Sequence, residues 1–129
     1  MNNLKDITVL EIDSINNQLK SINSYNKNGN LIYNKELVSE KKTKQNIYKY
    51  DENGNKIYFK NSTGLEYWKE YNENGKVIYT KYSDGFEEWC EYDTNGNLIH
   101  HNNTDGYEEW YKYDDNGNNI YHKENNYEK

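Results

Sequence analysis

A repeat of 21 residues runs through most of this 129-residue chain and constrains its fold more than any other feature. Five columns keep this spacing, and each holds one residue type: Tyr50, Tyr71, Tyr92 and Tyr113; Gly54, Gly75, Gly96 and Gly117; Ile57, Ile78, Ile99 and Ile120; Gly64, Gly85 and Gly106; Trp68, Trp89 and Trp110. An array of this kind gains stability unit by unit, from contacts between neighbouring repeats. An earlier, degraded unit ends near residue 33, and about four extra residues separate it from its successor.

Each unit reads as two strands and two turns. In the third unit, residues 64–71 and 76–82 are rich in Tyr, Trp, Ile and Thr, which favour strands. The first turn, residues 72–75, starts with Asn or Asp, whose side chain accepts hydrogen bonds from backbone N–H groups, and ends with Gly, which supplies positive φ. This pattern is typical of a type I turn that closes into a Gly bulge. The second turn carries an Asp-Gly pair, as in Asp84-Gly85, which suits a tight primed turn.

We therefore predict an all-β fold: an antiparallel meander of tandem 21-residue β-hairpin repeats that forms a twisted or coiled sheet of about nine or ten strands. The whole chain, residues 1–129, is expected to be a single repeat domain. Within it we expect an N-terminal cap at 1–20, a degraded first repeat with a Lys-rich insertion at 21–46, and regular repeats at 47–125. Residues 7–12 are a candidate extra edge strand, and residues 15–22 are the best candidate for a helix.

The turn also predicts the cross-strand pairs of a hairpin, which are Tyr71 with Val77, Glu70 with Ile78, and Trp68 with Thr80. Because side chains alternate across a sheet, the Trp and Ile columns should share one face and the Tyr column should lie on the other. We expect the Trp–Ile row to be the better buried one, with an exposed aromatic platform as the rival interpretation. Both faces are half polar, so a thin single layer or a coiled sheet is favoured over a thick two-layer core.

Charge restricts the class of partner. The chain has 16 Lys, 22 Asp or Glu and a net charge of −6, and every one of its basic Lys/Arg residues is a lysine. Residues 47–129 carry −8, whereas residues 1–46 carry +2. A negative surface repels nucleic acids and acidic membranes and attracts basic protein surfaces. Without arginine the chain also lacks bidentate phosphate clamps. We therefore expect no direct nucleic-acid binding and no membrane association, and no apolar run of 18 residues predicts a membrane span.

The compartment follows from the N-terminus and the cysteine content. Residues 1–6 show no basic segment followed by an apolar stretch, so no signal peptide is expected. The single cysteine, Cys90, has no internal disulfide partner and fits a reducing compartment as a small strand residue. We therefore expect a cytoplasmic protein. Because a meander has unpaired edges, it is expected to be a monomer or an edge-to-edge homodimer.

Three segments share the pattern Tyr-Asp-x-Asn-Gly-Asn-x-Ile: residues 50–57, 92–99 and 113–120. The unit at Tyr71-Asn72 departs from it by one residue. The pattern resembles the YD repeats of the RHS family over about residues 20–125, and the hairpin layout is more loosely similar to MORN-type repeats. The resemblance implies serial β-hairpins. It transfers no catalytic residue, because the repeats themselves have none.

Three groups of residues are of the types found in metal-binding or catalytic sites. Residues 114–118 partly match a calcium loop, but their Gly lies too early and the element recurs as a hairpin turn. The histidines His100, His101 and His122 are metal-ligand types, yet two of them replace ordinary strand residues at equivalent repeat positions. Paired carboxylates around Trp89 and Trp110 repeat with the strands instead of gathering in one irregular pocket. We therefore predict no enzyme activity, no metal and no cofactor.

What remains is an acidic, aromatic surface in the last two units. Tyr and Trp are frequent binding hot spots, and acidic groups steer a basic partner. The predicted partner-binding residues are Glu87, Glu88, Glu91, Tyr92, Asp105, Tyr107, Glu108, Glu109 and Tyr111. They predict a non-enzymatic inhibitor that covers the basic, nucleic-acid-binding surface of a protein, such as a toxin nuclease (as an immunity protein does) or a CRISPR-type defence enzyme (as an anti-CRISPR does).

Three other interpretations stay open. The tryptophans Trp68, Trp89 and Trp110 would stack on sugar rings in a carbohydrate-binding module of a cell-surface or toxin-associated protein. The acidic face would serve only solubility if it is merely solvated. The chain would be purely structural if it is a fragment of a longer repeat array.

Overall fold

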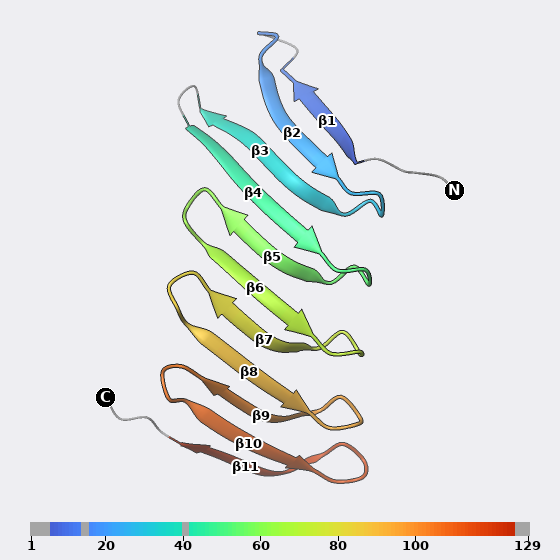
Figure 1. The fold of residues 1–129 in the computed structure, drawn as a ribbon, viewed down its shortest axis with the longest axis vertical. Coiled ribbons are helices and arrows are strands. Elements are labelled where there is room, and N and C mark those ends of the chain that lie inside the picture. Colours follow the sequence, from blue (N-terminus) through green and yellow to red (C-terminus); the bar gives the residue numbers. More distant parts are fainter. Residues whose placement is uncertain (1–5, 14–15, 40–41, 126–129) are drawn as a thin grey trace. The chain divides into compact units, whose positions relative to one another are not determined.

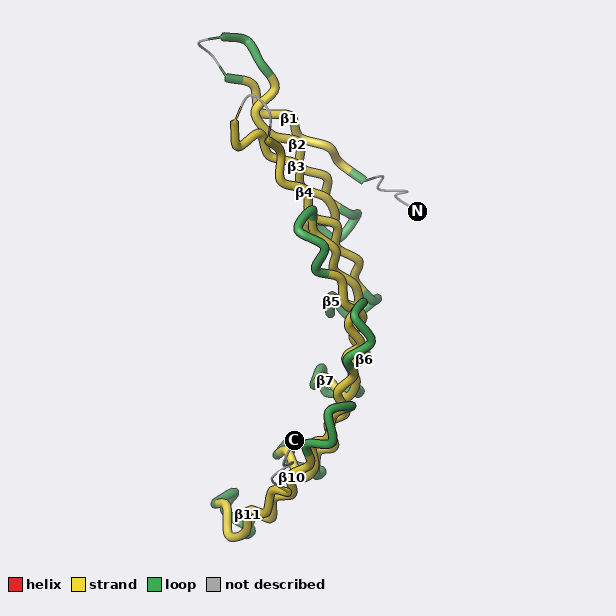
Figure 2. Tube along the Cα trace, turned by 90° about the vertical axis from the view of Figure 1, so that its left-hand side faces the viewer, coloured by secondary structure: helices red, strands yellow, loops and turns green. Residues whose placement is uncertain are grey.

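The computed structural model describes residues 6–13, 16–39 and 42–125, and within these ranges it contains only strands and connecting segments (Figures 1 and 2). Eleven strands form one antiparallel meander sheet in which each strand pairs with the next along the chain, and the sheet is not closed into a barrel. The predicted all-β hairpin meander is confirmed. In the described part of the chain, no helix has the length and hydropathy needed to cross a bilayer.

The chain forms two compact units, residues 1–66 and 67–129. The first unit holds five complete strands: β1 (Ile7–Ile12), β2 (Leu19–Tyr25), β3 (Leu31–Ser39), β4 (Lys42–Tyr50) and β5 (Lys56–Asn61). The extra strand predicted at residues 7–12 is confirmed as β1, which pairs with β2. The helix predicted over residues 15–22 is wrong from Leu19 onward, because pairing with β1 and β3 overrides a weak local preference. Ile15 lies outside the described residues.

The Lys-rich insertion lengthens the hairpin of β3 and β4. Both strands have nine residues, whereas β5 has six. Leu37 pairs with Thr43, and Ser39 pairs with Lys42 across a register shift. The extra residues therefore extend the ladder between the two strands.

A row of asparagine side chains also links the strands of this unit. The Nδ2 atom of Asn34 donates to Oδ1 of Asn23 at 2.6 Å, and Nδ2 of Asn46 donates to Oδ1 of Asn34 at 3.2 Å. The central amide, that of Asn34, both donates and accepts, so side-chain hydrogen bonds join three neighbouring strands.

The second unit holds the remaining strands: β6 (Glu66–Tyr71), whose first residue belongs to the first unit, β7 (Val77–Tyr82), β8 (Glu87–Tyr92), β9 (Leu98–Asn103), β10 (Glu108–Tyr113) and β11 (Asn119–Asn125). Each of the five hairpin units contributes two strands, and β1 adds one. The described residues therefore hold eleven strands instead of the nine or ten predicted.

The first turn of each unit has the predicted bonds. In the unit of Asp93, Oδ1 of this residue accepts hydrogen bonds from the backbone N–H groups of Asn95 and Asn97, both at 2.9 Å. The N–H of Gly96 donates to the carbonyl of Asp93 at 3.0 Å, and Gly96 has a φ of 84°. This is the left-handed conformation that glycine adopts at low cost.

The second turn differs from its prediction. The N–H of Gly85 donates to the carbonyl of Tyr82 at 3.0 Å, and the N–H of Tyr82 donates to the carbonyl of Phe86 at 2.9 Å. These two bonds match those of the first turn, so both turns close with a Gly bulge. The predicted two-residue primed turn is therefore wrong. Tyr82 and Phe86 close the turn, so residues 83–85 form the loop instead of the Asp-Gly dipeptide alone.

The isoleucine column marks a bulge that changes the predicted register. Tyr71 pairs with Val77 as expected, but Glu70 pairs with Tyr79, and Trp68 pairs with Lys81. Ile78 is therefore the extra residue of the strand. The register skips the equivalent Ile99 and Ile120 in the same way. One extra residue moves every later side chain to the other face, so the predicted pairs Glu70–Ile78 and Trp68–Thr80 are wrong.

Burial also departs from the prediction. No apolar side chain of the described residues is fully buried, and Trp68 and Trp89 keep exposed fractions of 39% and 37%. Ile120 is 65% exposed, while the polar Thr80 is only 4% exposed. The expectation of a buried Trp–Ile row is therefore wrong, because no second layer covers a single sheet. Stability rests on cross-strand pairs worth about 0.2–1 kcal/mol each.

Candidate functional site

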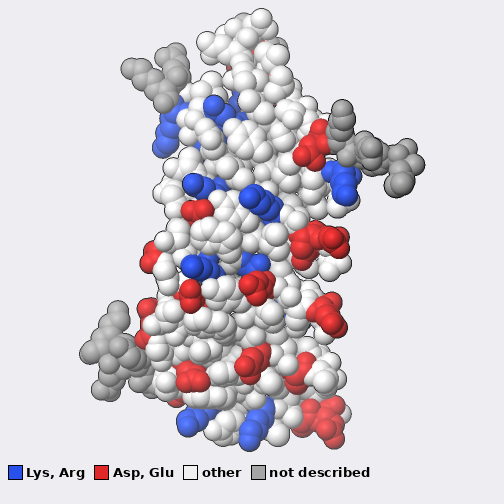
Figure 3. Space-filling view, viewed as in Figure 1, with Lys and Arg blue, Asp and Glu red and all other residues white. Residues whose placement is uncertain are grey.

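The second unit carries most of the negative charge. Residues 67–129 contain 6 Lys and 14 Asp or Glu, whereas residues 1–66 contain 10 Lys and 8 Asp or Glu. Within the second unit, Figure 3 shows carboxylates over the strands and at the turns along one edge. The charge of −8 gives this unit a field that attracts basic surfaces.

The three tryptophans lie on one face of the second unit. Tyr79 pairs with Glu70 on one side and with Trp89 on the other, and His100 pairs with both Glu91 and Trp110. Because alternate residues of a strand share a face, these pairs align the indoles as predicted. We call this side the indole face, defined by Trp68, Trp89, Trp110, Glu87, Glu91, His100 and Glu108.

His100 links the indole and carboxylate groups of this face. Its ring stacks on Trp110 with centroids 5.5 Å apart and an interplanar angle of 15°. Its Nε2 lies 2.8 Å from Oε1 of Glu108, and its Nδ1 lies 3.6 Å from Oε2 of Glu91. Both ring nitrogens thus contact acids from different strands, which fixes the plane of the ring against the indole.

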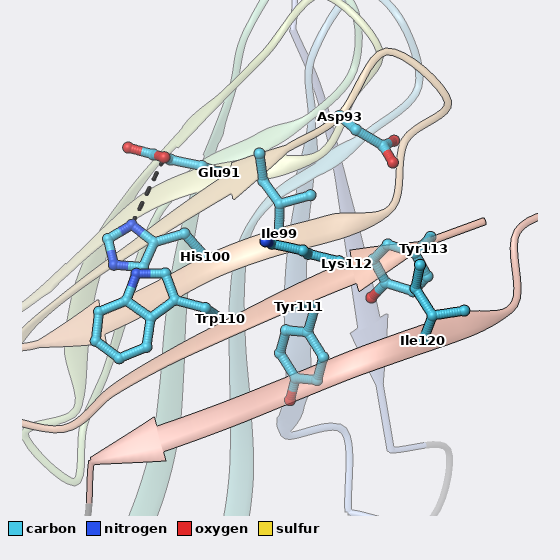
Figure 4. A pocket seen from close by; sticks show the side chains of 9 residues that line it. All are labelled: Glu91, Asp93, Ile99, His100, Trp110, Tyr111, Lys112, Tyr113 and Ile120. Carbon is cyan, nitrogen blue, oxygen red and sulfur yellow. Dashed lines mark ion pairs between the residues drawn. The ribbon is translucent and has the colours of Figure 1, made fainter. Parts of the chain in front are cut away.

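An open groove of about 600 Å³ lies beside this stack. Figure 4 shows Ile99, His100, Trp110, Lys112 and Ile120 around it, with the ion pair from His100 to Glu91 at its rim. The lining combines apolar surface with the ammonium of Lys112 and the two carboxylates of Glu91 and Asp93. A groove of this composition accepts an amphipathic side chain or a ring with polar substituents.

The opposite side of the sheet is richer in tyrosine. We call it the tyrosine face, defined by Glu88, Cys90, Tyr92, His101, Tyr107, Glu109, Tyr111, Tyr113, His122 and Glu124. Cross-strand pairs show that these residues share a face: Cys90 pairs with His101, and Glu109 pairs with both His101 and Glu124. The Tyr column was predicted to lie opposite the indoles, and the alternation along β8 confirms this for Trp89 and Tyr92.

Glu109 is the centre of a polar network on the tyrosine face. The hydroxyls of Tyr107 and Tyr111 donate to its Oε2 at 2.8 and 2.6 Å. His101 Nδ1 lies 3.3 Å from its Oε1, and His122 Nε2 lies 3.3 Å from its Oε2. The side chain is only 12% exposed, so these contacts replace most of its hydration.

The network shifts the acidity of its members. Burial by itself raises the pKa of Glu109, but hydrogen bonds from Tyr111, Tyr107, His122 and His101 outweigh it and lower the pKa. The hydrogen bond from Tyr107 to Glu109 raises the pKa of Tyr107, and the separate bond from Tyr111 to Glu109 raises the pKa of Tyr111 to about 12. At neutral pH the site is therefore a carboxylate held by two neutral phenols.

The nine predicted partner-binding residues are divided between two faces. Glu87, Glu91 and Glu108 lie on the indole face, and Glu88, Tyr92, Tyr107, Glu109 and Tyr111 lie on the tyrosine face. Asp105 lies in the turn before β10, where its N–H donates to Oδ1 of Asn103 at 3.0 Å. One flat partner surface therefore contacts only part of this set.

The structure bears on two further predictions, those for residues 114–118 and for Cys90. Oδ1 of Asp114 accepts hydrogen bonds from the N–H groups of Asn116 and Asn118 at 2.9 and 2.8 Å, so residues 114–118 form a hairpin turn as expected. Cys90 is half-buried, and burial raises the pKa of its thiol. It is protonated at neutral pH, as expected for a strand residue.

Glu124 was missed by the reasoning from sequence. It lies directly opposite Glu109 on β11, and the single hydroxyl proton of Tyr107 is shared between the two carboxylates. The bulge at Ile120 sets this register, and nothing in the recurring isoleucine column by itself predicts a bulge.

Comparison with known proteins shows a likeness of fold. No protein-family model matches the chain, and no curated protein matches it. A chain in the crystal structure of TcdB2-TccC3-Cdc42 is similar with a TM-score of 0.64 and 20% identity, over 88% of this chain and 7% of that one. A chain in the crystal structure of TcdB2-TccC3-TEV gives a TM-score of 0.41 and 10% identity, over 94% and 10%.

The chain thus spans a small fraction of the length of these structures. The first likeness shows the fold and agrees loosely with the resemblance of the repeat to RHS-type YD repeats.

Proposed function

We propose that the chain is a non-enzymatic protein-binding module that acts in the cytoplasm and inhibits a partner by covering a basic, nucleic-acid-binding surface. A toxin nuclease or a CRISPR-type defence enzyme has a surface of this kind. Carboxylates of the module take the places that phosphates occupy in the partner's nucleic-acid complex.

The indole face is the contact surface in this proposal. The observation that carries it is the 37% exposure of Trp89, which lies on β8 between Glu87 and Glu91. Glu108 of β10 lies on the same face. Indoles are frequent hot spots of protein interfaces, and rim carboxylates speed the approach of a basic partner. The tyrosine face suits this role less well, because its central carboxylate, Glu109, is 12% exposed and already accepts several hydrogen bonds.

We also propose that the repeats are YD repeats of the RHS type. The fold likeness and the recurring Tyr-Asp-x-Asn-Gly-Asn-x-Ile pattern support this assignment. It is compatible with a chain whose whole role is binding, since the pattern specifies hairpin turns and no reactive group.

The neighbouring residues Glu87 and Glu88 provide a matched test, because they lie on opposite faces. The wild-type chain would be used to capture partners from the native host, and the captured protein would be purified. Glu87→Lys and Trp89→Ala should each weaken binding to that protein by more than about tenfold, and Glu88→Lys should have a smaller effect. Binding should weaken with salt and compete with nucleic acid.

Equal affinities of wild type, Glu87→Lys and Trp89→Ala would contradict the proposed surface. A partner that binds nucleic acid equally well in the presence of the module would contradict the proposed inhibition.

A carbohydrate-binding module is the second candidate, and the exposure of Trp68 and Trp89 favours it. Exposed aromatic rings in a row on one face provide stacking surfaces for sugar rings. Titration with neutral oligosaccharides, followed by tryptophan fluorescence, separates the two candidates. Saturable quenching that is insensitive to salt and is abolished by Trp89→Ala supports sugar binding, and its absence excludes it for the sugars tested.

A further inference from the structure

The last two strands bring three metal-ligand side chains together on the tyrosine face. Glu109 of β10 lies directly opposite Glu124 of β11, and His122 shares the face of Glu124 because it lies two residues before it. The Nδ1/Nε2 or carboxylate oxygen atoms that these three residues offer all lie within 4.8 Å of one another. This group is separate from the indole face and plays no part in the function proposed above.

The spacing of these atoms fits a tetrahedral ion. Nε2 of His122 lies 3.3 Å from Oε2 of Glu109. Zinc binds histidine nitrogen and carboxylate oxygen at about 2.0–2.2 Å, so two ligands of a tetrahedral zinc are about 3.3 Å apart. The imidazole and the carboxylate are therefore already at the separation that one shared ion requires, and the ion would take the place of the proton in their hydrogen bond.

The charge of the group also favours a cation. Two carboxylates directly opposite each other on neighbouring strands repel each other. Lys123, between His122 and Glu124 in sequence, lies on the opposite face with its ammonium over Trp110. In the described part of the chain, the ion pairs of Glu109 are with His101 and His122 only. The hydroxyl of Tyr107 bridges the two acids, at 2.8 Å from Glu109 and 3.1 Å from Glu124, but adds no positive charge.

His101 is placed to support the group from β9. Its Nδ1 lies 3.3 Å from Oε1 of Glu109, the oxygen that His122 does not contact. A second imidazole on the outer oxygen of a ligating carboxylate holds its orientation, an arrangement common around protein-bound metals.

We propose that His122, Glu109 and Glu124 bind one divalent transition metal, with Zn²⁺ as the representative ion and water in the fourth position. Mixed imidazole and carboxylate ligands suit zinc better than calcium or magnesium, which prefer oxygen alone. The ion joins β10 to β11, so it fastens the final hairpin of the sheet. His101 acts as a positioning residue for Glu109.

The test uses Zn²⁺ itself and the full 129-residue chain. Calorimetric titration should give one ion per chain, and Co²⁺ should give the absorption of a tetrahedral complex. His122→Gln and Glu124→Gln each remove a ligand and should weaken Zn²⁺ binding by more than about 100-fold, whereas His101→Gln should weaken it by only about 10-fold and leave one ion per chain. Both proposed ligands on β11 are exposed, so their replacement does not threaten the fold.

Two variants serve as matched controls. His100 also contacts two glutamates, Glu108 and Glu91, but on the indole face, so His100→Gln should bind Zn²⁺ as the wild type does. Cys90 lies on the tyrosine face opposite His101, and Cys90→Ser should also retain binding. No Zn²⁺ uptake by the wild type, full uptake by His122→Gln and Glu124→Gln, or equal loss in either control would overturn the proposal.

Discussion

The hydroxyl of Tyr92 donates a hydrogen bond to the backbone carbonyl of Val77 at 2.8 Å. Twenty-one residues later, the hydroxyl of Tyr113 donates to the carbonyl of Leu98, also at 2.8 Å. In both cases the tyrosine ends one strand, and the acceptor begins the strand that precedes it in the chain. The recurring tyrosine thus links one hairpin to the previous one, which gives the tyrosine column a structural role beyond strand propensity.

Tyr92→Phe should lower the free energy of unfolding by about 1 kcal/mol, because it removes one half-buried hydrogen bond and keeps the ring. Urea denaturation followed by circular dichroism would measure the change. Tyr121→Phe is the matched control, since Tyr121 is 43% exposed and its ring, which Lys112 contacts, remains. Equal losses for both variants would show that the bond to Val77 is not the cause.

Asp93 should titrate below the ordinary range of aspartate. Hydrogen bonds from the backbone N–H groups of Asn97, Asn95 and Gly96 and from the side chain of Asn97 lower the pKa of its carboxyl. Asp51 and Asp114 have lowered pKa values for the same reason. NMR titration of the side-chain carboxyl carbons would measure all three, and ordinary values at these positions would contradict the turn geometry.

The lowered pKa values make the turns sensitive to acid. A carboxyl whose pKa is lower in the folded state contributes stability above its unfolded pKa, near 4, and loses it as the pH falls through the folded value. The triple variant Asp51→Asn, Asp93→Asn, Asp114→Asn should therefore lose less stability than wild type between pH 5 and pH 2. Asn72 already makes the equivalent bonds, at 3.0 Å to Asn74 and Lys76, so the turn survives the change.

Gly117→Ala should destabilise the final hairpin by about 1–2 kcal/mol, because Gly117 has a φ of 83° and a Cβ there strains the backbone. No atom lies within 4 Å of the added Cβ, so a steric clash does not contribute. Gly117→Asn should cost less, since asparagine tolerates the left-handed region. Thermal unfolding would rank the variants, and an alanine variant as stable as the wild type would contradict the assigned turn.

The sequence predicted the first turn of each repeat better than it predicted the faces of the sheet. The Asp-x-Asn-Gly signal acts locally, so residues 93–96 were enough to predict how Asp93 and Gly96 close the first turn. The faces depend on register, and the single bulge at Ile78 exchanges Tyr79 and Thr80 between them. The isoleucine column was interpreted as buried because isoleucine is usually buried, whereas here it marks the residue that the ladder skips.

The prediction of the candidate sites was also limited by the strand register. The acids near Trp89 and Trp110 were recognised from composition, but their division into two faces follows from the pairs of Glu87 with Lys81 and of Glu88 with Thr80. Glu124 lies outside the recurring columns, so only the register of β10 and β11 reveals that it faces Glu109.

The most direct test of whether the indoles are exposed on one face of a single sheet is acrylamide quenching of tryptophan fluorescence. The double variant Trp68→Phe, Trp110→Phe leaves Trp89 as the one tryptophan to be measured. With Trp89 at 37% exposure beside Tyr79, we expect red-shifted emission and efficient quenching in the folded chain. Blue-shifted emission that resists quenching until the chain unfolds would contradict the open indole face and the binding role proposed for it.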